Sequence, residues 1–126
     1  MLILFRYGGK KYAWDTAAGA LSVLTALEYR MLEALTPPME PICPTALRYE
    51  LSKYDSSTVE ECYDGLLEKA ANGVIFTPEN GSVRLPDAEE ALLRAALVAA
   101  TGKLPPKVTP VGENQELIRE MLGTDN

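Results

Sequence analysis

Two short runs of alternating residues near the start of the chain, joined by a pair of glycines, constrain the fold most. Residues 2–7 and 10–14 each alternate with a period of two, and Gly8-Gly9 lies between them. Alternation predicts strands, and adjacent glycines accept the positive φ angles of a primed two-residue turn. The hairpin register is predicted to pair Tyr7 with Lys10, Phe5 with Tyr12 and Ile3 with Trp14. After a turn over residues 15–19, residues 20–24 are expected to add a short third strand.

Helices are predicted in the middle of the chain. Thr25 and Glu28 form a capping box that begins the first helix, and Pro37-Pro38 ends it. Pro44 favours the first turn of a second helix, because proline's fixed φ suits that position. The inward side chains of this second helix are predicted to be Leu47, Leu51 and Tyr54.

A third helix, which residues 55–57 are predicted to start, bears on nucleic-acid binding through its residues 58–72. We expect Ser57 and Glu60 to cap it and Asn72-Gly73 to end it. Four acidic residues against one basic residue give the helix a net charge of −3: Glu60, Glu61, Asp64 and Glu68 against Lys69. A helix that reads the DNA major groove needs Arg, Lys, Asn or Gln near its N-terminus. Because the whole chain also carries a net charge of −6, we expect no nucleic-acid partner.

The order of these elements predicts a fold class. Residues 74–76 and 83–85, joined through Asn80-Gly81, indicate a second β-hairpin. A three-stranded antiparallel sheet, three helices and then a hairpin are typical of an α+β winged helix-turn-helix domain, here over residues 1–86.

A helical extension follows this predicted domain. Asp87 and Glu90 are expected to cap an Ala- and Leu-rich helix within residues 87–102, with Gly102 as its stop. Its wide apolar face suits docking on the domain or on a partner, including a second copy through residues 87–101. Residues 103–126 are expected to form a proline-rich linker and a short amphipathic tail.

The absence of histidine narrows the possible chemistry. The chain of 126 residues has no His and two cysteines, Cys43 and Cys62, whose spacing of 19 residues fits neither a disulfide framework nor a zinc site. We therefore expect no catalytic residue, no metal and no cofactor, and reduced thiols in a cytoplasmic protein. No apolar run approaches the roughly 18 residues of a membrane span.

The predicted third strand is a candidate binding edge. Residues 20–24 contain neither Lys nor Pro, which commonly protect sheet edges. A free edge beside an apolar groove is what β-augmentation requires, because a peptide backbone pairs with the strand. The pattern leaves two alternatives equal: an open edge, or one covered by the helix at 87–101.

Residues 3–76 resemble the PqqD-like fold, the recognition element that binds leader peptides of ribosomally made, post-translationally modified peptides. The resemblance lies in "LFRYGGKKYAWDTAAGALSVLTALEYRMLEAL" and continues in "YDSSTVEECYDGLLEKAANGVIFT". The resemblance is strongest to the N-terminal domain of the radical SAM maturases that install thioether links in peptides. These maturases continue into a barrel with a Cys-x3-Cys-x2-Cys site, and nothing of this kind follows Thr77. We therefore expect a free-standing recognition protein or an excised or diverged domain.

The resemblance implies a function and a set of site residues. A leader peptide would add as a strand and lie beside the third helix, and the chain would present it to a modifying enzyme without catalysing a reaction. The residues implied are Leu21, Ser22, Val23 and Leu24 on the strand and Glu60, Tyr63, Asp64 and Leu67 on the helix. Tyr63 fits a core position equally well. The alternatives are a dimerisation or interaction module and a diverged DNA-binding regulator.

Overall fold

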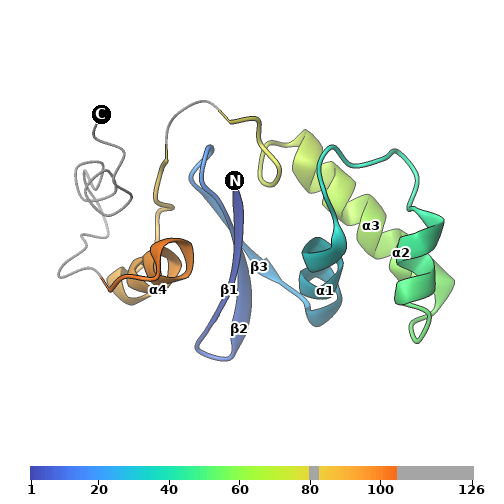
Figure 1. Ribbon diagram of the computed structural model, residues 1–126, viewed down its shortest axis with the longest axis horizontal. Coiled ribbons are helices and arrows are strands. Elements are labelled where there is room, and N and C mark those ends of the chain that lie inside the picture. Colours follow the sequence, from blue (N-terminus) through green and yellow to red (C-terminus); the bar gives the residue numbers. More distant parts are fainter. Residues whose placement is uncertain (80–82, 105–126) are drawn as a thin grey trace.

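A computed structural model describes residues 1–79 and 83–104 and shows a mixed α+β arrangement (Figure 1). A three-stranded antiparallel sheet lies between α4 on one side and the helices α1 to α3 on the other. The elements within these residues are β1 (Leu2–Tyr7), β2 (Lys10–Asp15), β3 (Ala20–Leu24), α1 (Ala26–Ala34), α2 (Thr45–Glu50), α3 (Ser56–Ala71) and α4 (Glu90–Thr101).

The N-terminal hairpin has the predicted register. β1 and β2 pair as expected from Tyr7–Lys10 to Ile3–Trp14. Gly8 and Gly9 both have positive φ angles, 60° and 78°, as a type I′ turn requires. β3 pairs with β2, so the sheet order is β1-β2-β3 and β3 lies at an edge.

Each face of the sheet has its own hydrophobic cluster. Ala13 and Leu24 point toward α1, α2 and α3, and the buried residues they join include Met31, Leu47, Val59, Tyr63 and Leu66. The opposite face packs on α4 through Phe5, Tyr12, Trp14, Leu93 and Leu97. The stacked rings of Phe5 and Tyr12 lie 5.3 Å apart between centroids. The predicted Ala- and Leu-rich helix, α4, therefore docks on the sheet. Docking on the domain was one of the two alternatives expected for it, the other being docking on a partner.

The predicted second hairpin is wrong within the described residues. Phe76 has a left-handed backbone with φ 52°, which turns the chain out of an extended path. The Thr77 N–H then donates to the buried carboxylate of Asp15 at 2.9 Å. The Arg84 N–H donates to the Thr16 carbonyl at 2.8 Å. Both segments thus bond to the end of β2 and its turn, and neither is a strand.

Two of the three predicted capping boxes are also wrong. The N-caps of α3 and α4 are Asp55 and Glu89, in place of Ser57 and Asp87, and neither cap makes a side-chain hydrogen bond to its helix. Glu60, the expected partner of Ser57, forms an ion pair with an arginine of α2 at 2.9 Å instead. The N-cap lies two residues before Ser57 in α3 and two residues after Asp87 in α4, so neither predicted pair has the spacing of a capping box.

The capping box of α1 is confirmed. The Glu28 N–H donates to the Thr25 hydroxyl at 3.1 Å, and the Thr25 N–H donates to the Glu28 carboxylate at 2.8 Å. Lys69 of α3 also donates to Glu28, at 3.3 Å. Burial raises the pKa of Glu28, but the Thr25 N–H and the Lys69 ammonium outweigh it and hold the pKa below its usual value.

Glu28→Gln should therefore lower the free energy of unfolding by about 1 kcal/mol at about pH 7. A carboxyl whose pKa is depressed by folding stabilises the protein above its unfolded pKa, and this contribution is lost as the pH falls through the folded pKa. The difference between the variant and the wild type should thus shrink at about pH 3 in urea titrations. Glu33→Gln, an exposed change on the same helix, is the control. An equal difference at both pH values would contradict the assignment.

The chain's last predicted segments, the proline-rich linker and the tail, lie outside the described residues from position 105 onward, as does the Asn80-Gly81 turn. In the described part of the chain, no helix combines the length and the apolar character needed to cross a bilayer.

Candidate peptide-binding site

The register of the sheet indicates which backbone groups of β3 face outward. Hydrogen-bonded and non-bonded pairs alternate in antiparallel sheets, and a two-residue turn closes on a hydrogen-bonded pair, here Tyr7 and Lys10. Every second residue of β2, starting with Lys10, therefore bonds to β1, and the residues that alternate with these bond to β3. Their partners are Ala20, Ser22 and Leu24. Leu21 and Val23 consequently direct their N–H and C=O groups away from β2, toward the edge of the sheet.

The outer edge of β3 is open within residues 1–79 and 83–104. No backbone hydrogen bond from another described segment reaches it. The expected alternative cover, α4, contacts β1 and packs on the face of the sheet instead. Val23 is 60% exposed, and the strand has no proline or lysine to discourage pairing.

The four strand residues implied by the resemblance are not equivalent. Ser22 and Leu24 are buried, and Leu21 packs partly against the cluster beneath α4. Val23 alone among them presents an exposed side chain. The edge therefore offers a partner mainly backbone groups, with one apolar side chain beside them.

The four predicted residues on α3 lie along the flank that faces α2 and the loop after α1. The Glu60 carboxylate pairs with the guanidinium on α2. Tyr63 is fully buried, as its alternative core assignment required, and its hydroxyl donates to the Glu40 carbonyl at 2.6 Å. Burial raises the pKa of Tyr63. Asp64 is exposed, and Leu67 lines a shallow apolar pocket with Phe76 and Pro37.

The opposite flank of α3 carries Cys62 and Lys69. Lys69 contacts Glu28, which follows β3 closely in the chain. This flank therefore faces the first turn of α1, which follows β3 in the chain, whereas Glu60 faces α2. Burial, and secondarily the charge of Glu28, raises the pKa of Cys62 to about 11, so the thiol stays protonated at neutral pH. The ion pair between Lys69 and Glu28 joins residues 41 positions apart, so no local pattern in the sequence predicts it.

No cluster of three or more His, Cys, Asp or Glu side chains suited to a metal ion occurs in the part of the chain that the structure describes. No protein-family model matches the sequence, and comparison with curated proteins returns no match.

Proposed function

We propose that this chain recognises a peptide by adding it as a strand to β3, without catalysing a reaction itself. The peptide would be the leader of a ribosomally made precursor, and the chain would present it to a modifying enzyme, of the radical SAM kind among others. The frame would be that of the PqqD-like winged helix-turn-helix domains. The observation that carries the proposal is the open edge of β3, where the backbone groups of Leu21 and Val23 face outward.

Strand addition would use four backbone groups of β3, the N–H and C=O of Leu21 and of Val23. Each exchanges a bond to water for a bond to the peptide, so the net contribution of each is modest. The peptide's side chains add affinity where they pack on exposed Val23. Holding the leader in this way raises the local concentration of the attached core peptide at the enzyme. The net charge of −6 favours a leader with Lys or Arg.

The test is a fluorescence-polarisation titration with a labelled leader peptide encoded by a short reading frame beside the gene. Val23→Pro removes one outward N–H and no bond to β2, and proline is tolerated at a sheet edge. We expect this variant to bind about 10-fold or more weakly, because a carbonyl of the peptide loses its donor. Val23→Thr keeps the N–H and the β-branched shape, so it should bind within about threefold of the wild type.

Equal binding by Val23→Pro and the wild type would contradict strand addition at β3. Absence of wild-type binding at about 100 μM would count against the leader proposal for that peptide. Circular dichroism of each variant confirms that the sheet is retained.

Self-association through α4 is the second candidate function. A groove of about 500 Å³ lies between β1 and α4. Tyr7, Val98 and Leu104, which line it, are 42%, 38% and 70% exposed. Sedimentation equilibrium distinguishes the two candidates: a mass that rises with concentration in the wild type, but not in Val98→Glu, favours association.

A further inference from the structure

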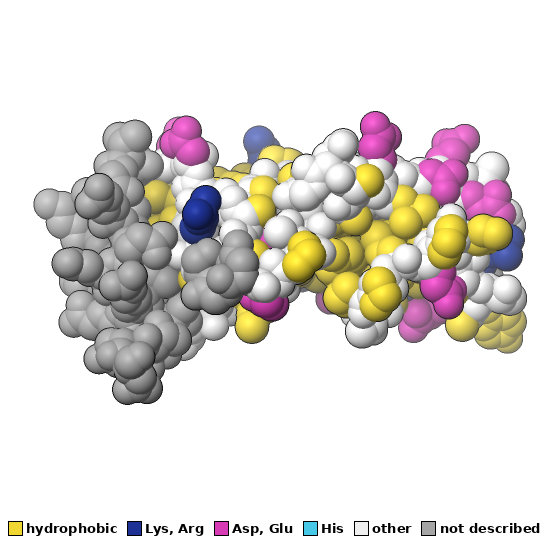
Figure 2. All heavy atoms as spheres, turned by 90° about the horizontal axis from the view of Figure 1, so that it is seen from above, with side chains coloured by type: hydrophobic (Ala, Val, Ile, Leu, Met, Phe, Trp, Pro, Cys, Tyr) yellow, Lys and Arg dark blue, Asp and Glu magenta, His cyan; other side chains and the backbone are white. Residues whose placement is uncertain are grey.

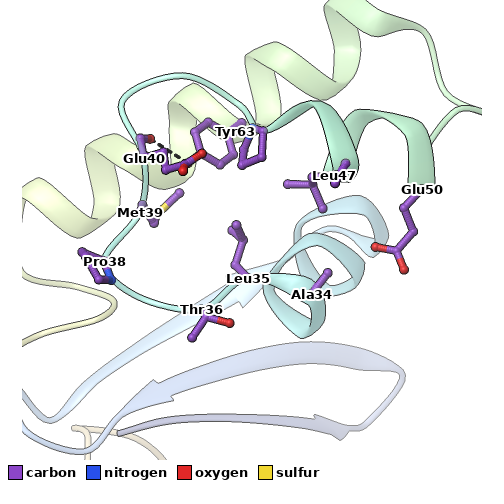
Figure 3. A pocket seen from close by; sticks show the side chains of 11 residues that line it. Ala34, Leu35, Thr36, Pro38, Met39, Glu40, Leu47, Glu50 and Tyr63 are labelled. Carbon is purple, nitrogen blue, oxygen red and sulfur yellow. Dashed lines mark hydrogen bonds between the residues drawn. The ribbon is translucent and has the colours of Figure 1, made fainter.

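A pocket of about 330 Å³ lies away from β3, between the end of α1, the loop 36–44 and α2. Its apolar part is formed by Leu35, Met39, Leu47 and Tyr63. Figure 3 shows these side chains around a common space, with Glu40 and Glu50 on opposite sides of it. The pocket therefore combines an apolar floor with two carboxylates at its rim.

The floor and part of the rim are held in place before any partner binds. Leu47 and Tyr63 are buried in the cluster between the sheet and the helices. The Tyr63 hydroxyl donates to the Glu40 carbonyl, which ties the loop to α3. A partner would therefore find a formed pocket and would not have to order it, which favours binding.

The charges of the pocket are all negative. Glu40 and Glu50 are exposed, and neither forms a salt bridge within the described residues. No lysine or arginine is among the residues that line the pocket. Arg48, the nearest base along α2, is paired with Glu60. Figure 2 shows apolar atoms exposed over this half of the molecule with acidic side chains around them.

We propose that this pocket binds a lysine or arginine side chain of a basic segment in a partner protein. Such side chains have an aliphatic stem and a charged end, so they bury the stem along apolar surface and keep the charge at the rim. The stem would lie on Leu35, Met39 and Leu47, and the cationic end between Glu40 and Glu50. The proposal is independent of strand addition at β3.

The probe is a capped heptapeptide, Gly-Gly-Leu-Arg-Leu-Gly-Gly amide, titrated into the 15N-labelled protein and followed by NMR. Its matched control has citrulline in place of arginine, which keeps the shape and removes the charge. We expect shifts at the amides of Glu40, Leu47 and Glu50, and about 3- to 10-fold weaker binding of the citrulline peptide, because two solvent-exposed ion pairs are lost. Equal affinity of the two peptides, or shifts confined to β3, would overturn the proposal.

Variants of the protein give the complementary test. Glu40→Gln with Glu50→Gln should reduce the affinity for the arginine peptide to that for the citrulline peptide. Glu33→Gln with Glu61→Gln removes two exposed carboxylates outside the pocket lining and should change nothing. Ala46→Trp, at an exposed lining position, should abolish the binding of both peptides by filling the pocket. A concentration-dependent mass that Ala46→Trp abolishes would assign the pocket to a second copy and overturn the proposal.

Discussion

Asp15→Ala should lower the free energy of unfolding by about 3–5 kcal/mol, because three backbone donors, one buried and two partly buried, lose their acceptor at once. The side chain of Asp15 is 1% exposed. One carboxylate oxygen accepts the N–H groups of Ala17 and Ala18 at 3.1 and 3.2 Å, which shapes the β2–β3 turn. The other accepts the Thr77 N–H at 2.9 Å. The variant therefore loosens both the turn before β3 and the segment after α3.

Urea unfolding followed by circular dichroism measures this loss. Asp64→Ala removes an exposed aspartate and should change stability by less than about 0.5 kcal/mol. Asp15→Asn keeps one oxygen acceptor and should give an intermediate loss. A loss below about 1 kcal/mol in Asp15→Ala would show that Thr77 and the turn do not depend on this carboxylate.

Trp14→Ala should also cost about 3–5 kcal/mol, because it leaves a large cavity between the sheet and α4. Trp14 is fully buried in the cluster that contains Leu93 and Leu97. Its indole N–H donates to the Arg84 carbonyl at 2.7 Å, so the same ring also anchors the segment that leads to α4. Hydrogen exchange in α4 should quicken more than exchange in α3, because α4 packs on this face of the sheet.

Two further variants separate packing from hydrogen bonding at this position. Trp14→Phe keeps an aromatic ring and loses the donor, so the expected loss is about 1–2 kcal/mol. Tyr49→Ala truncates an aromatic side chain that is 83% exposed and should cost less than about 0.5 kcal/mol. Equal losses in Trp14→Ala and Tyr49→Ala would contradict a core beneath α4.

The features predicted from sequence are those set by neighbouring residues. Gly8-Gly9 fixes the turn and the pairing of β1 with β2, because only a primed turn suits two adjoining glycines between strands. Thr25 and Glu28 satisfy each other within one turn of α1. The failed second hairpin had a similar local signal, but the bond from Thr77 to Asp15 spans 62 positions and prevailed.

The candidate site likewise has a part that neighbouring residues predict and a part that depends on contacts between distant residues. The composition of residues 20–24 predicted an unprotected edge, and β3 is an edge strand. The orientation of α3 depends on contacts with other helices, such as Lys69 with Glu28 and Arg48 with Glu60, which no local pattern indicates. The helix residues implied by the resemblance, Glu60, Asp64 and Leu67, therefore stay a prediction. The pocket beside Glu40 and Glu50 joins four segments, the end of α1, the loop 36–44, α2 and α3, and no local pattern indicates it.

Amide hydrogen exchange along β3, with and without the leader peptide, is the most direct test of peptide recognition at the edge of this strand. In the free protein the Leu21 and Val23 amides should exchange much faster than those of Ser22 and Leu24, because only the latter bond to β2. Saturating peptide should slow Leu21 and Val23 to the rates of their neighbours. Uniformly slow exchange in the free protein, or unchanged fast exchange at Leu21 and Val23 with the peptide bound, would contradict recognition at this edge.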